Sequence, residues 1–332
     1  MTKDEIKILI LRRLYEIVFH EGREGIVNIK EFSASNNIDP EQAFKVVDEM
    51  KEIGFIEEEW FGGTYVFTPA ALIYCEEQKL ADPKLIDYQK KVRTKLLVTL
   101  AAMQEKSPYG EGADWQEWLQ QADVSDQDFT NNHKIMQSMG LIRYESPSEY
   151  FITPYGMNKV KEYQRRKRRL EEFEKLNKLD GVTEQQRGHK LEDLLGEIIK
   201  EEGWEVDKRV RVPGEEIDII IHRGLEYYLI SCKWEKKPTQ SEELDIMYSR
   251  AMDRSNLKGS IIMSMTGFMD SCIKKAIGKM GNCHLVMFGP IDINKIIHNE
   301  NSFSDLLQEK YKEVMLHRRI LLDGKIRDVK IN

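Results

Sequence analysis

The chain has 332 residues, of which 41% are apolar and 32% charged, and its formal net charge is −7 at pH 7. This length exceeds one ordinary core and predicts two or three domains, while the composition excludes an intrinsically disordered chain. No stretch approaches the roughly 18 apolar residues of a membrane span, and the charged N-terminal run is typical of an amphipathic helix and not of a signal peptide.

The four cysteines are scattered and form no CxxC pair. This pattern favours a reducing compartment and argues against a structural zinc site. We therefore expect a cytoplasmic protein without a membrane partner. The modest negative charge decides nothing about nucleic-acid binding, because enzymes that only visit DNA can be acidic overall.

Two segments of the first half resemble each other. GFIEEEWFGGTYVFTPAALIYCEE begins at Gly54, and GLIRYESPSEYFITPYGMNKVKEY begins at Gly140. Each has two short alternating runs around a turn, which predicts a β-hairpin. Each then reaches a Thr-Pro pair, which is typical of the first residues of a helix.

Helical periodicity precedes both hairpins. It predicts helices over residues 6–19, 29–35 and 40–53 in the first copy, and over 88–104, 115–121 and 126–139 in the second. Three helices and a hairpin are typical of a winged helix-turn-helix, so the first half is interpreted as two such modules in tandem. The third helix and the wing of this module are its usual means of entering a DNA groove.

The third helices differ in their polar residues. The second copy carries Asn131, Asn132, His133 and Lys134, which we predict to contact DNA because amide and basic side chains read base edges. The third helix of the first copy is mostly acidic. Winged helices also serve as protein-binding and dimerisation modules, and this alternative stays open for both copies.

A basic segment follows the second copy. Residues 157–179 contain no helix breaker and include five consecutive basic residues, 165–169. We favour a solvated spacer helix whose glutamates pair with the basic residues at helical spacing. The alternative is that Arg165, Arg166, Arg168 and Arg169 contact a phosphate backbone.

The second half alternates helical and strand patterns. It predicts a helix at 184–201, strands at 204–212, 217–221 and 227–233, a helix at 242–256, a strand at 260–264, a helix at 270–280 and a strand at 284–288. This order predicts a mixed α/β layer fold. Near the C-terminus, Asp323-Gly324 lies between two alternating runs and predicts a further hairpin, which either pairs with another subunit or lies along a nucleic-acid backbone.

An acid and a lysine stand out in the second and third of these strands. A two-residue turn at Arg223-Gly224 places Asp218 opposite about Leu229, so Lys233 lies just beyond the paired part of the hairpin. We expect the two side chains to converge at one end of the sheet. Such a cluster suits phosphodiester hydrolysis, in which a metal ion polarises the phosphate and a lysine orients water or stabilises charge.

This pattern resembles the Mrr-like restriction endonucleases of the PD-(D/E)XK nuclease superfamily over roughly residues 188–297. The resemblance rests on GHKLE at 188–192, GEEID at 214–218, SCK at 231–233 and GSIIMSMTGF at 259–268. It implies a Mg²⁺ ion, with Mn²⁺ as the alternative. It also implies roles for five residues in or beside the site: Glu192, Asp218 and the backbone carbonyl of Cys232 as metal ligands, Lys233 as a catalytic residue, and Ser231 at a catalytic position.

Ser231 departs from the family pattern, which has Glu or Gln at this position. Serine ligates a metal only weakly, so the site has one charge fewer for a divalent ion. Three explanations remain open: compensation by Glu192 or Glu216, an acid from the following helix (Glu242 or Glu243), or loss of catalysis.

The fold class predicted is a multidomain chain: tandem winged helices followed by an α/β restriction-endonuclease-like domain with a mixed sheet. The predicted boundaries are 1–84, 85–160, a linker at 161–182, 183–300 and a C-terminal extension at 301–332. The predicted function is a metal-dependent DNA endonuclease in restriction or antiviral defence, acting as a homodimer and with a defence-system partner protein. The alternative is a catalytically degenerate DNA-binding regulator, and RNA stays open as a substrate.

Overall fold

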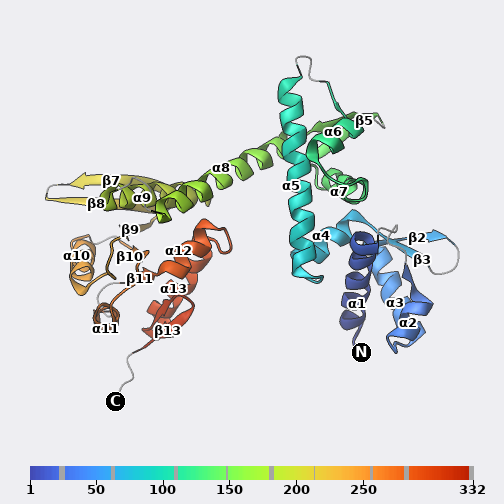
Figure 1. The fold of residues 1–332 in the computed structure, drawn as a ribbon. Helices are drawn as coiled ribbons and strands as arrows, with labels where there is room; N and C mark the ends of the chain where they lie inside the picture. The colour runs from blue at the N-terminus through green and yellow to red at the C-terminus, as the bar shows by residue number, and fades with distance from the viewer. Residues whose placement is uncertain are drawn as a thin grey trace. The chain divides into compact units, whose positions relative to one another are not determined.

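The computed structural model describes residues 1–21, 27–60, 64–107, 111–146, 149–178, 183–212, 214–254, 257–279 and 284–328. The chain forms two compact units, Met1–Gln164 and Arg165–Asn332 (Figure 1). The tips of the first two predicted hairpins and Cys283 lie outside the described residues. Within those residues, no helix is long and apolar enough to cross a bilayer.

The first unit is rich in helices and contains two repeats. The first repeat consists of α1 (Lys3–Glu16), η1 (Ile17–Glu21), β1 (Val27–Asn28), α2 (Ile29–Ser35), α3 (Pro40–Glu52), β2 (Ile56–Trp60), β3 (Thr64–Phe67) and α4 (Pro69–Glu77). The second consists of α5 (Pro83–Lys106), β4 (Ala113–Asp114), α6 (Trp115–Ala122), α7 (Asp126–Ser138), β5 (Ile142–Ser146), β6 (Glu149–Ile152) and α8 (Pro154–Asn177). Their sheets have equivalent strand orders, β1-β3-β2 and β4-β6-β5.

The predicted Thr-Pro pairs have the same structural role in both repeats. The Thr68 hydroxyl donates to the Gly54 carbonyl at 2.7 Å, and the Thr153 hydroxyl donates to the Gly140 carbonyl at 2.6 Å. Each hydroxyl therefore ties the start of one helix to the end of another. Gly54 and Gly140 have φ values of +72° and +69°, a conformation that suits glycine at a helix C-terminus.

A buried polar network joins the two repeats. The Tyr15 hydroxyl donates to Glu76 at 2.8 Å, and Glu76 forms a short ion pair with Arg93. Arg93 donates to the Asn132 side chain at 2.9 Å, and Asn132 donates to Gln89 at 2.8 Å. Arg93 of α5 therefore links Glu76 of α4 in the first repeat to Asn132 of α7 in the second.

The second unit contains a five-stranded mixed sheet, as the sequence predicts. Its elements are α9 (Glu184–Glu201), β7 (Glu205–Val212), β8 (Glu215–Arg223), β9 (Glu226–Lys233), α10 (Ser241–Met252), β10 (Gly259–Ser264), α11 (Asp270–Lys279), β11 (Leu285–Phe288), α12 (Pro290–Ile297), α13 (Phe303–His317), β12 (Ile320–Leu322) and β13 (Lys325–Arg327). The strand order is β11-β10-β9-β8-β7. Strands β9, β10 and β11 are parallel, whereas β7, β8 and β9 are antiparallel.

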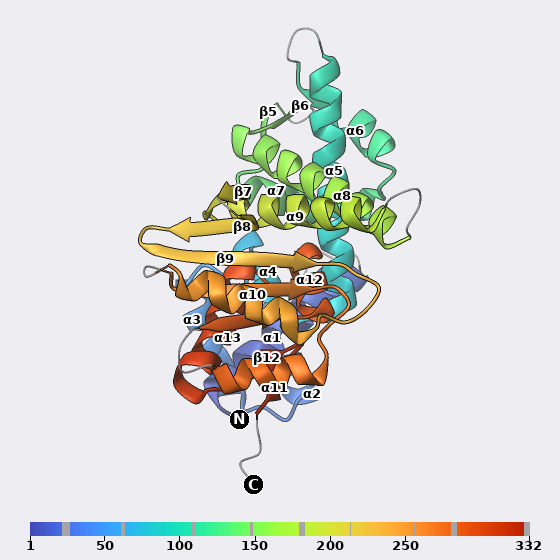
Figure 2. The same ribbon diagram turned by 90° about the vertical axis from the view of Figure 1, so that its left-hand side faces the viewer.

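Helices cover both faces of this sheet. Figure 2 shows α9 on one side of β8 and β9 and α10 on the other. The core on the α9 side also includes residues of α12 and α13, and the core on the α10 side includes residues of α11 and β12. Because β8 and β9 are antiparallel, the start of β8 lies beside the end of β9, next to the N-terminal half of α9. The predicted site residues lie here.

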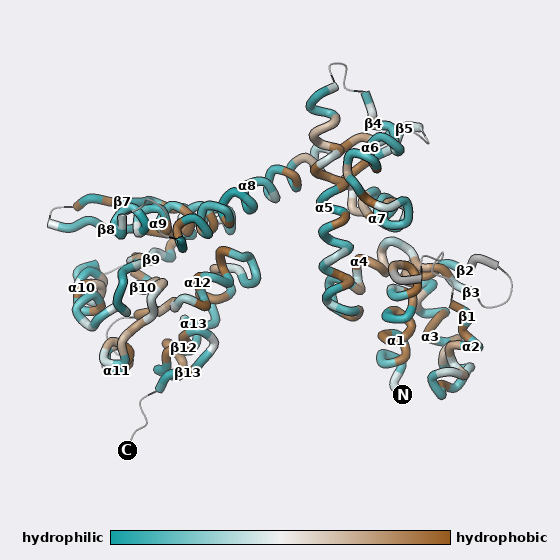
Figure 3. The backbone as a smooth tube through the Cα atoms, viewed as in Figure 1, coloured by the Kyte–Doolittle hydropathy of each residue, from teal (hydrophilic) through white to brown (hydrophobic). Residues whose placement is uncertain are grey.

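The segment predicted as a linker, 161–182, is partly built into the second unit. Its residues 161–177 form the C-terminal part of α8, whose middle is hydrophilic (Figure 3). Phe173 and Leu176 are 1% exposed and belong to the core on the α9 side of the sheet. This half of the helix is therefore structural and not a detached spacer.

The predicted C-terminal hairpin forms as β12 and β13 and is anchored to its own domain. The Asp323 carboxylate accepts from the backbone N–H groups of Ile291 and Asp292, at 2.9 and 3.1 Å, and so caps the N-terminus of α12. Lys310, 1% exposed, pairs with Asp292 at 2.7 Å. The hairpin thus stabilises α12.

Candidate active site

The register of β8 and β9 differs from the prediction. Ile220, and not Asp218, pairs with Leu229, because the two-residue turn lies between Arg223 and Glu226, one residue later than expected. Moving a hairpin turn by one residue moves every cross-strand partner by two. The observed register places Asp218 level with Ser231.

The Asp218 carboxylate binds to β9 directly. Its Oδ2 atom accepts from the backbone N–H of Cys232 at 2.8 Å and from the Ser231 hydroxyl at 3.0 Å. The backbone pairing of β8 and β9 stops at Ile219 and Ile230. Beyond this point, the Asp218 carboxylate accepts the hydrogen bond of the Cys232 N–H. Ser231, 3% exposed, is therefore a buried neighbour of Asp218.

Cys232 is a core residue, as predicted. Its side chain packs in the core on the α9 side, and burial raises the pKa of its thiol well above the ordinary value. A buried thiol with a raised pKa is a poor nucleophile. The contribution of Cys232 to the site is its backbone, since its N–H orients Asp218.

Glu192 reaches the same place from α9. It is 5% exposed, and burial is the largest cause that raises the pKa of its carboxyl. A hydrogen bond with His189, at 3.3 Å, opposes this shift, and the nearby charge of Asp218 adds to it. The effect of Asp218 indicates two carboxylates close enough to repel each other.

A pocket of about 570 Å³ joins these residues. Four acids line it, Glu184, Glu192, Asp218 and Glu235, and Lys233, Lys236 and Lys237 contribute basic side chains. Lys236 pairs with Glu184 at 2.9 Å, but its side chain is 80% exposed, so this ion pair contributes little. The pocket thus combines paired carboxylates with a basic wall.

The segment that carries the basic wall is held by specific hydrogen bonds. Arg187 donates to the Trp234 carbonyl at 3.0 Å, and its guanidinium lies 4.9 Å from the centre of the Trp234 ring. The Thr266 hydroxyl donates to the Lys237 carbonyl at 3.0 Å, and the Thr239 N–H donates to Gly267 at 2.9 Å. The sequence alone does not reveal these supporting residues, because their partners are distant in the chain.

The acids named as substitutes for Ser231 lie in different environments. Glu243 on α10 pairs with Lys233 at 2.7 Å, while Glu216 pairs with Arg211 at 2.9 Å. Glu192 alone of these three lines the pocket with Asp218. In the part of the chain that the structure describes, no cluster of three or more His, Cys, Asp or Glu side chains is arranged to hold a metal.

The predicted DNA-contacting residues of α7 require correction. Asn132 is fully buried in the polar network, so its assignment as a DNA contact is wrong. Asn131 donates to the Val18 carbonyl at 2.8 Å, and the His133 ring stacks on Phe129 with centroids 5.2 Å apart. Lys134 is exposed. The face of α7 that was expected to enter a groove is largely occupied by contacts within its own unit.

The arginines of α8 face acids and carbonyls of the second unit. Arg169 is 7% exposed and lies 2.9 Å from Glu201, and Arg166 donates to the His298 carbonyl at 2.8 Å. Arg165 and Arg168 lie 3.4 Å from Glu201 and Glu197. The acids come from α9 and not from the helix itself, which explains why sequence periodicity did not identify them.

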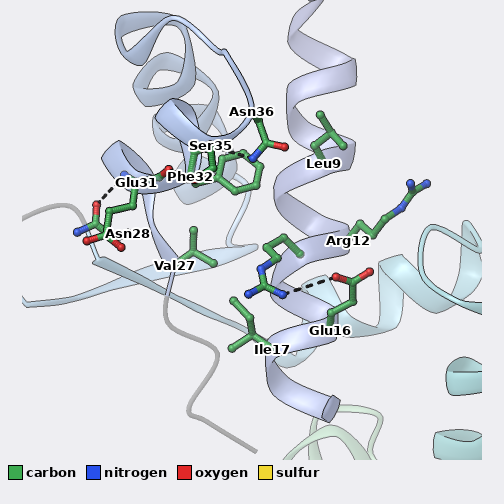
Figure 4. Close-up of a pocket in the computed structure, with 11 residues that line it drawn as sticks. Leu9, Arg12, Glu16, Ile17, Val27, Asn28, Glu31, Phe32, Ser35 and Asn36 are labelled. Atoms are coloured by element: carbon green, nitrogen blue, oxygen red, sulfur yellow. Dashed lines mark hydrogen bonds and ion pairs between the residues drawn. The ribbon is translucent and has the colours of Figure 1, made fainter. Parts of the chain in front are cut away.

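A second pocket, of about 540 Å³, lies between α1 and α2 of the first repeat (Figure 4). Its charged residues are Arg12, Arg13, Glu16 and Glu31. Arg12 donates to the Leu80 carbonyl at 2.9 Å, and Arg13 lies 3.8 Å from Glu16. Two basic and two acidic side chains leave this pocket without a net charge that would select a phosphate.

Residues 183–288 match the family model described as restriction endonuclease. They form a restriction-endonuclease-like domain. All four predicted catalytic residues of the chain, Glu192, Asp218, Ser231 and Lys233, lie within this domain, as do Arg209 and Glu243. The helix-rich first unit lies outside the match.

Solved structures that contain similar chains include one protein of unknown function, AF1548, at 26% identity over 40% of this chain and 70% of that chain, with a TM-score of 0.27. Protein VC1899 from Vibrio cholerae is 13% identical over 68% of this chain and 53% of its own, with a TM-score of 0.30. The restriction endonuclease FokI is 11% identical over 82% of this chain and 61% of its own, with a TM-score of 0.33. No curated protein matches the chain.

Proposed function

We propose that this protein is a metal-dependent nuclease that hydrolyses phosphodiester bonds in DNA. The observation that carries the proposal is the pocket in which Glu192 and Asp218 meet Lys233 within the restriction-endonuclease-like domain. Paired acids next to a lysine suit a reaction in which an oxygen nucleophile attacks phosphorus and negative charge grows on the phosphate.

The donor set fits a divalent cation. Glu192 and Asp218 are close enough for the charge of one to raise the pKa of the other, and a cation between them would relieve this repulsion. Glu192, Asp218 and the Cys232 carbonyl would hold Mg²⁺ or Mn²⁺, which are hard ions that prefer oxygen ligands. When bound, the ion would polarise the phosphate and lower the pKa of its water.

The protein's own residues would orient the reacting groups. The Cys232 N–H and the Ser231 hydroxyl fix the Asp218 carboxylate. Glu243, 2.7 Å from Lys233, holds the lysine ammonium at the end of β9, where it would stabilise charge on the phosphate. Lys236 and Lys237 would contact phosphates on either side of the bond that is cleaved.

The first unit would supply recognition. Its two repeats, each with three helices and a hairpin, are interpreted as winged helix-turn-helix modules with the predicted boundaries 1–84 and 85–160. Because α7 packs against the first repeat, a protein-binding or dimerisation role is favoured for the second module over groove reading. A homodimer, a role in restriction or antiviral defence, and a partner protein from such a system remain parts of this proposal.

A catalytically degenerate DNA-binding regulator is the second candidate. Ser231 favours it, because the site has two carboxylates where the family has a third charged or amide ligand. The two candidates differ in one property, which is hydrolysis, so a single assay separates them.

The test is nicking of supercoiled plasmid in Mg²⁺, in Mn²⁺ and in EDTA, with a single-stranded RNA as a parallel substrate. Asp218→Asn and Lys233→Ala should each abolish metal-dependent nicking without changing the far-UV circular dichroism spectrum. Lys274→Ala, an exposed lysine on α11, is the matched control and should cut normally. A wild-type protein that binds DNA but never cuts it would support the regulator, and cleavage of RNA alone would correct the substrate.

A further inference from the structure

Arg209 has an unusual backbone conformation. Its φ of +51° lies in the left-handed region, although it stands in the middle of β7. In the part of the chain that the structure describes, the other non-glycine residues with positive φ lie at helix ends or in turns. This conformation costs a non-glycine residue about 1–2 kcal/mol, and such strained residues cluster at functional sites.

The distortion lies directly across from Asp218. The pairs on either side are regular: Lys208 is opposite Ile219, and Val210 is opposite Ile217. However, Ile219 packs in the core on the α9 side of the sheet, whereas Ile217 packs in the core on the α10 side. Strand alternation therefore breaks at the pair formed by Arg209 and Asp218, and the break brings both side chains next to Glu192.

The ion pairs of Arg209 do not account for the strain. Its Nη1 lies 3.6 Å from Glu192 Oε2, too far for a hydrogen bond, and its Nη2 lies 2.9 Å from Asp193 Oδ1. Asp193 already has a second cation, Lys208, at 2.7 Å. The Arg209 and Asp193 side chains are 37% and 41% exposed, so the ion pair between them contributes little and can be exchanged for another anion.

We propose that Arg209 is a phosphate-binding residue of the nuclease site, which leaves Glu192 and contacts the nucleic-acid backbone when substrate binds. This inference rests on the proposed function, because it takes a phosphodiester as the ligand. A guanidinium binds two phosphate oxygens with parallel hydrogen bonds. The Arg209 guanidinium lies beside two carboxylates that would otherwise repel the same phosphate. A cation at this position therefore lowers the electrostatic free energy of bringing the substrate to Glu192 and Asp218.

Three substitutions separate the side chain from the backbone. Arg209→Gly removes the guanidinium and keeps the kink, because glycine adopts positive φ without a penalty. Arg209→Ala removes the guanidinium and keeps the strain, and Arg209→Lys keeps the charge but loses the planar fork. Arg211→Ala is the control, because Arg211 is on the same strand, is 85% exposed and pairs with Glu216, whereas Arg209 lies beside Glu192.

The experiment measures binding of a short fluorescein-labelled DNA duplex by anisotropy in EDTA, over a series of salt concentrations. Arg209→Gly should melt at or above the wild-type temperature and bind the duplex about tenfold more weakly. The slope of log K against log salt concentration should be shallower by about 0.9, which corresponds to the loss of one phosphate contact. Arg209→Lys should keep the wild-type slope with intermediate affinity.

An Arg209→Gly variant with wild-type affinity and slope would overturn the proposal, and so would an equal loss in Arg211→Ala. Neither result depends on cleavage. If the wild-type protein binds DNA through Arg209 but never cuts it, this inference stands and the nuclease proposal fails. If the wild-type protein cuts and Arg209→Gly binds normally, the nuclease proposal stands and this inference fails.

Discussion

Replacing Ser231 by glutamate would restore the acid that the family pattern has at this position, and the structure predicts a strong dependence on metal. Ser231 is 3% exposed and its hydroxyl donates to Asp218 at 3.0 Å. Glutamate there replaces a hydrogen-bond donor by a second carboxylate next to the first. We expect Ser231→Glu to be destabilised in EDTA and to recover stability as Mg²⁺ is added.

The magnitude follows from the geometry. Two unit charges about 4 Å apart repel by about 4 kcal/mol at an effective dielectric constant of about 20. Fitting the larger side chain into a filled site adds about 1–3 kcal/mol. In a domain of this size 1 kcal/mol shifts the melting temperature by roughly 2–4 °C, so the charge alone should lower Tm by roughly 8–16 °C.

The assay is thermal unfolding in EDTA and over a Mg²⁺ titration, with Ser231→Gln as the matched neutral variant. Glu and Gln have nearly the same size, so the difference between their melting temperatures isolates the charge. Metal that binds only the folded protein should raise Tm in proportion to RT ln(1 + [Mg²⁺]/Kd), with a lower midpoint for Glu than for Gln. Equal melting temperatures in EDTA together with equal midpoints would refute the placement of position 231 beside the charge of Asp218.

Three further variants test other parts of the structure. Burial raises the pKa of Glu192, so the folded protein binds this proton more tightly than the unfolded chain does, and stability falls as pH rises through that pKa. Glu192→Gln should therefore raise Tm in EDTA at neutral pH, and the difference should vanish towards pH ~4. A lower Tm of this variant at neutral pH would contradict the reasoning. Arg93→Ala breaks the buried ion pair with Glu76 and should lower the free energy of unfolding in urea by about 3–5 kcal/mol. The control Arg143→Ala, at an exposed ion pair, should change that free energy by less than about 0.5 kcal/mol. Equal losses in the two variants would rule out the buried network. Lys237→Ala should weaken duplex binding and flatten the salt dependence by about 0.9, with Lys274→Ala as the control, and an unchanged slope would remove Lys237 from the basic wall.

The secondary structure was largely predictable because its signals are local. The helix expected at 184–201 has these bounds in the structure, and Thr183 and Gln186 form its capping box. The two Thr-Pro pairs likewise begin α4 and α8. Periodicity and capping involve residues a few positions apart, so they do not depend on how the chain packs.

The candidate site was predictable in its residues but not in its geometry. Asp218 and Lys233 line one pocket, as expected, yet the partner of Asp218 is Ser231 and not a residue near Leu229. The prediction failed because it put Gly224 at the second position of the turn, whereas Gly224, with a φ of +60°, occupies the first. Glu243 was one of four acids named, and the fold brought it to Lys233.

By itself, the sequence determined the repeat, the order of elements and the mixed sheet, and it named the acids and the lysine of the proposed site, since each depends on local pattern or a short motif. Tertiary structure decided which side chains are free. Asn132 looks like a DNA contact in the sequence and is buried in a polar network with residues of α5, and Arg169 looks solvated and lies against Glu201. The break in alternation at Arg209 and Asp218 has no sequence signal, and it is visible only because Ile217 and Ile219 pack in cores on opposite faces of the sheet.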